Sequence, residues 1–287
     1  MAHFFAPRPH SFGKATTLLR KPSLALIALA VALHAGMTLA REGVEVGNNS
    51  KFAKFIPAAQ VEQSAQQQYQ QTLQEAAGQK ALAANNDPQL LRLRAISQKI
   101  IPFTQEWNPR AKDWQWEVNL IGSKQVNAFC MPGGKIAFFS GILDQLQLTD
   151  DEVAMVMGHE IAHALREHAR ERMGKTVATS VGANLLSQLL GAGNAGQQAI
   201  GLGAQLLTMK FSREDESESD LVGMELAARA GYNPQAGVTL WQKMSAHSKG
   251  APPQWMSTHP SGNNRIANMQ NNLPKVMPLY QRAVQAK

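Results

Sequence analysis

The feature that most constrains this 287-residue chain is an H-E-x-x-H pattern at residues 159–163. On a helix, His159 and His163 lie four residues apart on one face, and both imidazoles can point a nitrogen at one ion. Glu160 lies one residue off that pair and can lean toward a metal-bound water without becoming a ligand. The pattern is typical of zinc sites that hydrolyse peptide bonds with a metal-activated water. It predicts one Zn²⁺ per chain.

The residues around the pattern predict that it lies on a helix. Residues 149–152 read T-D-D-E, a capping box in which a hydroxyl is followed three residues later by glutamate. Apolar side chains then recur at helical spacing, namely Val153, Val156, Met157, Ile161 and Ala164. We expect a helix from about Asp150 to Met173, ending before Gly174. The alternative is a surface helix whose two histidines face the core.

A catalytic zinc has three protein ligands and one open position, so a third ligand must come from elsewhere. The acidic stretch 214–220 follows Ser212, which is a good helix N-cap. Glu216 and Asp220 share one helix face. We interpret Glu216 as the third ligand and Asp220 as a carboxylate that accepts the free ring N–H of a ligand histidine. On spacing alone, Glu218 fits the ligand role about equally well.

Several segments resemble the motifs of one metallopeptidase family. Besides H-E-x-x-H, they are residues 212–220 (S-R-E-D-E-S-E-S-D), residues 127–136 (N-A-F-C-M-P-G-G-K-I), and Thr258-His259-Pro260 with Arg265. The chain resembles the gluzincin family that includes HtpX, the CAAX prenyl protease and the mitochondrial OMA-type protease. Within it, the chain is most similar to soluble periplasmic members such as BepA and LoiP. Ser219 stands where the family usually has alanine. The resemblance, over about residues 85–275, implies that Glu216 rather than Glu218 is the third zinc ligand.

The expected mechanism assigns a role to each remaining motif residue. Glu160 accepts the proton of the water and passes it to the leaving amine. His259 or Arg265 can supply a second electrophile for the oxyanion. Alternatively, His259 can fill the open zinc position as an inhibitory latch. An extended substrate can pair with a strand through main-chain hydrogen bonds, and the strand expected to do this carries Asn127, Ala128 and Phe129.

The N-terminal segment has the pattern of a signal peptide. The first 41 residues contain no acidic residue; basic residues come first, then ten apolar residues over 24–33, then small residues up to Ala40. We expect export to the periplasm with cleavage near Ala40. An uncleaved N-terminal anchor or an organellar targeting peptide is the alternative.

The chain is expected to divide into three parts. These are a signal peptide (1–40), an N-terminal tail with an amphipathic helix (41–84), and a zinc metallopeptidase domain (85–287) without the C-terminal helical-repeat domain of BepA-type relatives. The net charge of +7 comes partly from the first part. No basic run indicates a nucleic-acid partner.

The remaining patterns predict a mainly helical α+β domain, of the zincin type, with a small β-sheet. Helices are expected over 58–84, 90–103 and 235–248, with a short helix from Gly141 and a last helix capped by Ser261. Residues 114–120 alternate as a half-buried strand, and 126–131 and 135–140 are expected to form a hairpin around Pro132-Gly133-Gly134. Residues 249–260 are expected to be a Pro-rich loop that carries His259.

Residues 176–209 contain no charged side chain. A transmembrane hairpin is one interpretation, but no run of about 18 apolar residues exists. A mobile helical hairpin packed over the cleft is favoured, and its apolar face can touch a membrane surface or unfolded substrate. Cys130, the single cysteine, is interpreted as a small half-buried hydrophobic residue rather than a catalytic thiol.

The function predicted from these observations is zinc-dependent endopeptidase action on unfolded or misassembled cell-envelope proteins, as protein quality control. The rival class is an envelope-protein assembly factor or chaperone whose zinc site is structural or vestigial. Replacing Glu160 by glutamine distinguishes the two classes, because only the protease depends on a general base.

Overall fold

A computed structural model of the protein describes residues 1, 3, 41–178, 203–247, 254–260 and 264–286. Two units, Met1–Glu42 and Gly43–Lys287, divide the chain, and all elements named below belong to the second. Among the described residues, no helix has both the length and the apolarity needed to cross a membrane.

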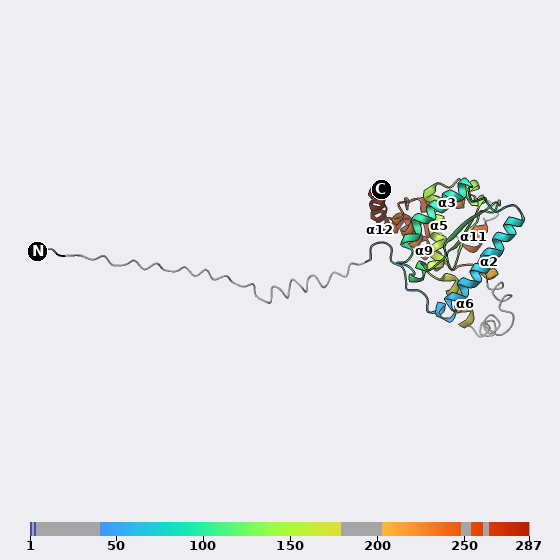
Figure 1. Ribbon diagram of the computed structural model, residues 1–287, viewed down its shortest axis with the longest axis horizontal. Helices are drawn as coiled ribbons and strands as arrows, with labels where there is room; N and C mark the ends of the chain where they lie inside the picture. Colours follow the sequence, from blue (N-terminus) through green and yellow to red (C-terminus); the bar gives the residue numbers. More distant parts are fainter. Residues whose placement is uncertain (2, 4–40, 179–202, 248–253, 261–263, 287) are drawn as a thin grey trace. The chain divides into compact units, whose positions relative to one another are not determined.

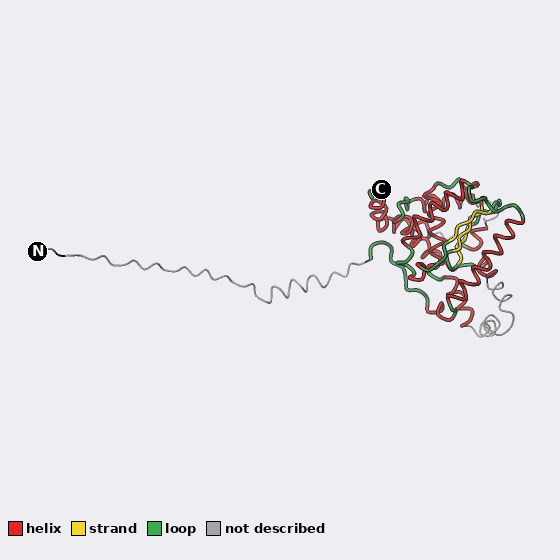
Figure 2. The backbone as a smooth tube through the Cα atoms, viewed as in Figure 1, coloured by secondary structure: helices red, strands yellow, loops and turns green. Residues whose placement is uncertain are grey.

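Helices make up most of the second unit and a three-stranded sheet lies among them, so the predicted mainly helical α+β class is confirmed (Figures 1 and 2). The helices are α2 (Ala58–Gly78), α3 (Pro88–Ile100), α4 (Ser140–Leu146), α5 (Asp150–Leu165), α6 (His168–Ala178), α9 (Arg213–Arg229), α10 (Ala236–His247), α11 (Gln254–Thr258) and α12 (Arg265–Gln285). The 3₁₀ helices are η1 (Lys51–Phe55), η2 (Ile101–Phe103) and η3 (Pro109–Lys112), and the strands are β1 (Glu117–Ile121), β2 (Ala128–Met131) and β3 (Lys135–Phe139).

The sheet has the order β1-β3-β2, with β1 parallel and β2 antiparallel to β3. The predicted hairpin is confirmed: Gly133 and Gly134, at φ of 87° and 79°, turn the chain between Met131 and Lys135. The first strand begins at Glu117, three residues later than predicted. The reason is that Trp114 still bonds back to the η3 carbonyl of Ala111, and the Glu117 amide is the one that bonds to Gly134.

Helix α2 crosses the sheet, and the Tyr69 hydroxyl donates to the Ile136 carbonyl at 2.6 Å. This helix ends at Gly78, not at residue 84 as predicted. Lys80 adopts a left-handed φ of 56°, and the chain then extends along the edge of β1, where Leu82 bridges Ile121. Pairing with the sheet edge therefore replaces the last helical turn and a half.

The motif helix is the main correction to the predicted elements. Its capping box is present, because Thr149 and Glu152 each accept from the other's backbone amide. The helix does not continue to Met173; α5 ends at Leu165 and α6 begins at His168. Glu167 has a left-handed φ of 58°, and the Asn108 side chain caps the freed Leu165 carbonyl at 3.0 Å. The turn sends α6 against η1.

Helices α5 and α9 cross at two glycines in the centre of the core. A methyl group placed on Gly158 would lie 2.7 Å from the Gly223 carbonyl oxygen, and one on Gly223 would lie 2.7 Å from the His159 amide nitrogen. Only glycine permits this backbone contact. It fixes the distance between the helix that carries H-E-x-x-H and the helix that carries the acidic motif.

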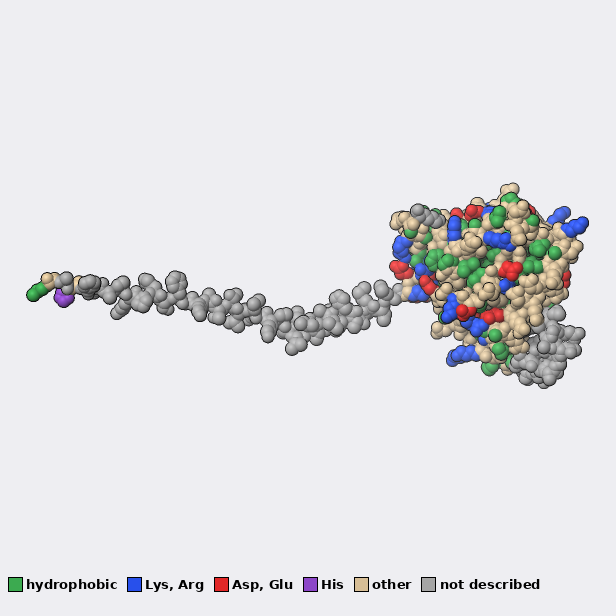
Figure 3. All heavy atoms as spheres, viewed as in Figure 1, with side chains coloured by type: hydrophobic (Ala, Val, Ile, Leu, Met, Phe, Trp, Pro, Cys, Tyr) green, Lys and Arg blue, Asp and Glu red, His purple; other side chains and the backbone are tan. Residues whose placement is uncertain are grey.

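The C-terminal elements differ from prediction in two places. The predicted helix 235–248 is observed as α10, but the predicted loop 249–260 contains the short helix α11, which ends just before His259. Helix α12 begins at Arg265 with Asn264 at its N-cap position, later than a cap at Ser261 predicts; Ser261 itself lies outside the described residues. On the face drawn in Figure 3, basic, acidic and hydrophobic side chains of the second unit are interspersed.

Candidate metal centre

Helix α5 places both histidines of the motif side by side in the core. His159 and His163 expose 3% and 4% of their surface, and their Nε2 atoms lie 3.1 Å apart. Glu160, between them in sequence, is equally buried. The i, i+4 spacing therefore brings two imidazole nitrogens to one point, as the sequence predicts.

Helix α9 contributes the carboxylate predicted for this point. Glu216 is fully buried, with Oε2 at 3.6 Å from His159 Nε2 and Oε1 at 3.5 Å from His163 Nε2. The competing candidate, Glu218, points elsewhere: its oxygens lie 2.6 Å from Arg166 Nη2 and 3.0 Å from His168 Nε2. The Ser212–Asp215 capping box is observed and fixes the residue at which α9 begins. This start places Glu216 and Glu218 on different faces of the helix.

His259 joins the same cluster from the end of α11, where its amide donates to the Trp255 carbonyl. Its Nδ1 lies 3.1 Å from Glu216 Oε1 and 3.3 Å from His159 Nε2. Of the described residues, His159, His163, Glu216 and His259 form a buried group whose ligand atoms all lie within 4.8 Å of one another.

The spacing of these atoms fits zinc. A tetrahedral ion with ligand distances near 2.0–2.1 Å has ligand atoms about 3.3 Å apart. The separations between neighbouring donor atoms of the cluster run from 3.1 to 3.6 Å. Two imidazoles, a carboxylate and a third imidazole are also the donor types that zinc prefers. These four side chains fit a zinc ion, which His159, His163 and Glu216 would hold, with His259 next to them.

The protonation states of the cluster also suit a metal. Burial lowers the pKa of His163 well below its usual range, and neighbouring imidazoles and Arg265 lower it further. Burial alone would raise the pKa of Glu216, but the hydrogen bond and charge of His259, with His159 and Arg265, outweigh it and lower the pKa. A neutral histidine and an ionised carboxylate are the forms that bind metal.

Asp220 and Arg265 lie behind His159 and Glu216 rather than on the cleft. Asp220 Oδ1 is 3.0 Å from His159 Nδ1. Arg265 donates two hydrogen bonds to the Asp220 carboxylate, from Nε and from Nη2, each at 2.6 Å. Arg265 Nη1 also lies 2.6 Å from Glu216 Oε2, and the guanidinium stacks on Trp241 at 3.8 Å. Burial opposes the shift, but the charge of Arg265 lowers the pKa of Asp220 to about 2. Of the two predicted electrophiles, His259 lines the cleft and Arg265 does not.

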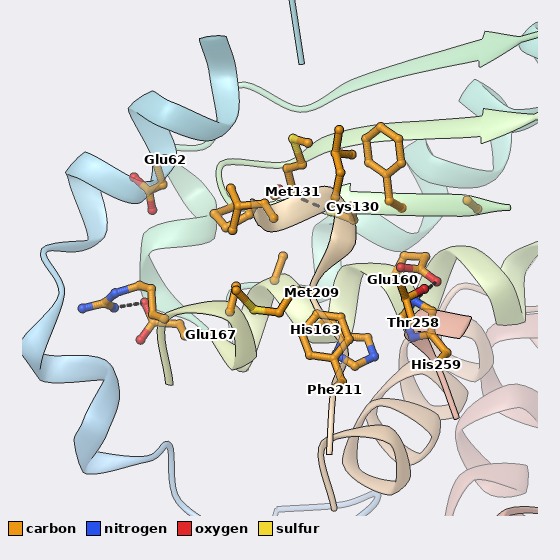
Figure 4. Close-up of a pocket in the computed structure, with 18 of the residues that line it drawn as sticks. Glu62, Cys130, Met131, Glu160, His163, Glu167, Met209, Phe211, Thr258 and His259 are labelled. Carbon is orange, nitrogen blue, oxygen red and sulfur yellow. Dashed lines mark hydrogen bonds and ion pairs between the residues drawn. The ribbon is translucent and has the colours of Figure 1, made fainter. Parts of the chain in front are cut away.

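A cleft opens beside the cluster. Figure 4 shows Glu160, His163 and His259 at one end of it, Cys130, Met131 and Met209 in the middle, and Glu62 and Glu167 at the far end. Asn127, Ala128 and Phe129, predicted to bind substrate, also line the cleft. Helical residues 203–208 bring Leu206 and Leu207 to its wall, whereas 179–202 of the predicted hairpin lie outside the described residues.

Cys130 is half-buried on β2, and burial raises the pKa of its thiol well above the usual value. A protonated thiol is a poor nucleophile. This environment fits the predicted role of a small hydrophobic residue.

Sequence reasoning missed three aromatic neighbours of the site. Trp255 donates its indole N–H to Glu160 Oε1 at 2.6 Å, Phe211 stacks on His163 at 4.0 Å between ring centroids, and His168 Nδ1 lies 3.0 Å from His163 Nδ1. Trp255 stands four residues before His259, a helical spacing that could have linked them. His168 follows the motif by five residues, off its ligand face, and only the break at Glu167 turns it inward.

The fold and the cluster together define a zincin-type metal centre. Comparison with protein families matches residues 88–273 to peptidase family M48. The chain belongs to this family, as the resemblance predicts, and the zinc prediction is confirmed with it.

Three relatives illustrate the match. The mitochondrial metalloendopeptidase OMA1 of Arabidopsis thaliana is 35% identical over 60% of this chain and 34% of its own length. The β-barrel assembly-enhancing protease of Yersinia pestis is 28% identical over 55% and 35%, and the metalloprotease LoiP of Escherichia coli is 29% identical over 53% and 60%. The chain thus spans less than two thirds of the length of each of these relatives.

Proposed function

We propose that this protein is a zinc-dependent endopeptidase. One observation carries the proposal: His159, His163 and Glu216 converge on one point, and Glu160 stands beside that point at the end of an open cleft. A purely structural zinc site is closed by four protein ligands and needs neither a cleft nor a general base.

In the proposed mechanism, Glu160 is the general base and then the general acid. When bound, zinc lowers the pKa of a coordinated water to about 7 and polarises the scissile carbonyl. Glu160 takes the proton from the attacking water and gives it to the departing amine. The Trp255 indole holds one Glu160 oxygen at 2.6 Å, which leaves the other oxygen for proton transfer. Asp220 and Arg265 act as positioning residues for His159 and Glu216.

The substrate is proposed to bind as an added strand. In the described sheet β2 pairs with β3 alone, and its residues Ala128 and Phe129 line the cleft. Main-chain hydrogen bonds would hold a peptide of almost any sequence. The apolar middle of the cleft, at Met131 and Met209, would receive a hydrophobic side chain.

We further propose that His259 is a latch. Its Nδ1 stands within 3.3 Å of two ligand atoms, close enough to complete a four-ligand set and leave no open position. Helix α11 would have to move for a substrate to enter. The catalytic-electrophile interpretation of His259 requires it to stay in place while the substrate binds.

The proposed substrates are unfolded or misassembled cell-envelope proteins. Recognition through the main chain supports this class, because it selects extended peptides rather than a sequence. The basic and then apolar N-terminal segment supports export to the periplasm with cleavage near Ala40, with a retained anchor or an organellar address as alternatives. Contact of 176–209 with a membrane surface is part of the proposal.

Hydrolysis of unfolded casein by the wild type and by Glu160→Gln tests the activity. The wild type should cleave casein, and a chelator should stop it; Glu160→Gln should retain zinc and lose cleavage. Zinc-loaded wild type that leaves casein intact, combined with a cellular role that Glu160→Gln still performs, would identify an assembly factor instead.

A further inference from the structure

His168 has a buried, polar side chain that takes no part in the proposed mechanism. It exposes 1% of its surface and lies at the start of α6, directly after the break at Glu167. Its ring is edge-on to that of the ligand His163, with 5.0 Å between centroids. A buried imidazole needs partners for both nitrogens, so its contacts must have a definite arrangement of protons.

The two nitrogens of His168 face different partners. Nε2 lies 3.0 Å from Glu218 Oε2, and Nδ1 lies 3.0 Å from His163 Nδ1. The next nearest carboxylate, Asp215, is 4.0 Å from Nε2, beyond hydrogen-bond distance. Glu218 is held in turn by Arg166 at 2.6 Å, and Arg166 also donates to the Gly47 carbonyl. The contacts form a row from Arg166 to the metal ligand.

Hydrogen-bond chemistry fixes the direction of this row. An ionised carboxylate only accepts, so Glu218 requires a proton on His168 Nε2. A neutral His168 then has a bare Nδ1, which accepts the Nδ1–H of His163. With its proton on Nδ1, His163 presents the lone pair of Nε2 to the point where the ligand atoms meet. The opposite direction would put the His163 proton on Nε2 and block metal binding.

We propose that His168 is a positioning residue that fixes the tautomer of the zinc ligand His163, with Glu218 as the group that sets the direction of the bonds. The other ligand has a shorter version of the same arrangement, since His159 Nδ1 contacts Asp220, which Arg265 holds. His159 thus contacts the Asp220–Arg265 pair directly. His163 contacts the Glu218–Arg166 pair through the imidazole of His168. The inference rests on zinc occupying the proposed site but not on proteolysis.

Zinc affinity, measured by competition with a chromophoric chelator on the full chain, tests the proposal. Loss of a group that orients a ligand typically costs about 10–100-fold in metal affinity. His168→Leu should therefore bind zinc about 10–100-fold more weakly. His168→Asn should recover most of the loss, because an amide oxygen can replace the accepting Nδ1. Ser219→Ala is the matched control: its hydroxyl lies 3.3 Å from the same Nδ1 but outside the row, so zinc affinity should not change.

A second measurement needs no substitution at the site. Long-range ¹H–¹⁵N spectra of the zinc-loaded wild type should show His163 protonated at Nδ1 and His168 protonated at Nε2 alone. A His168 that is doubly protonated or protonated at Nδ1 would overturn the proposal, as would wild-type zinc affinity in a folded His168→Leu protein. Zinc-loaded protein that shows these tautomers but leaves casein intact would refute the proposed function and leave this inference standing.

Discussion

The crossing of α5 and α9 at Gly158 and Gly223 makes a quantitative prediction for Gly223→Ala. The new methyl group would lie 2.7 Å from the His159 amide nitrogen and 2.8 Å from the Gly158 carbonyl carbon. Both atoms belong to backbone, which cannot rotate away. Ordinary contact begins near 3.4 Å, so the two helices must separate by roughly 0.7 Å.

This separation acts on the metal centre more than on the fold. His159 and His163 move with α5 while Glu216 moves with α9, and metal–ligand distances tolerate only about 0.2 Å. A misplacement of about 1 Å can cost about 10²-fold in catalysis. Overpacking costs about 1–3 kcal/mol, but alanine stabilises a helix by about 1 kcal/mol relative to glycine. The net loss of stability should therefore stay below about 2 kcal/mol.

Thermal unfolding in chelator and zinc content after dialysis measure the two effects separately. We expect Gly223→Ala to lower Tm by a few degrees, about 2–4 °C per kcal/mol for a unit of this size, and to lose most of its zinc. Gly78→Ala is the matched control, because it is a helical glycine with open space around the added methyl group. Full zinc content in Gly223→Ala would refute the claim that this crossing sets the ligand spacing.

Three further predictions follow from single contacts. His259→Ala should raise casein turnover and self-cleavage if the latch is correct; a fall in kcat of about 10²–10³-fold at full zinc content would support the electrophile role instead. Cys130→Ser should leave turnover unchanged; a loss of turnover at full zinc content would contradict the assignment of Cys130 as a small hydrophobic residue. Burial opposes the shift, but hydrogen bonds from Lys243 and Thr149 lower the pKa of Glu152. Glu152→Gln should therefore lower the free energy of unfolding in urea by about 1 kcal/mol at pH values above about 4.3. This difference from the wild type should vanish as the pH falls through the lowered folded-state pKa of Glu152. A difference that stays constant with pH would refute the prediction.

The two helices that carry the predicted ligands could be predicted from the sequence because their signals are local. Thr149–Glu152 and Ser212–Asp215 are complete capping boxes, and the spacing of His159 and His163 determines their common face. The break after Leu165 was not accessible. Arg166 and Glu167 are compatible with a helix, and the turn depends on Asn108, more than fifty residues earlier in the chain, and on the docking of α6 against η1.

The same distinction applies within the site. The choice between Glu216 and Glu218 depends on the rotation of α9 about its axis, which Gly158 and Gly223 set by contact. The position of Arg265 depends on α12 packing against α9, which places its guanidinium on Asp220. Tertiary contacts of this kind leave no local signal in the sequence, so only the resemblance to the family motif favoured Glu216 over Glu218.

The most direct test of the central claim is a zinc titration of metal-depleted protein, with casein hydrolysis as the readout. We expect no hydrolysis without metal, a linear rise on adding zinc, and saturation at one equivalent per chain. Glu216→Ala should not recover at one equivalent. Hydrolysis that persists in depleted protein, or full recovery of Glu216→Ala at one equivalent, would contradict a single zinc held by His159, His163 and Glu216.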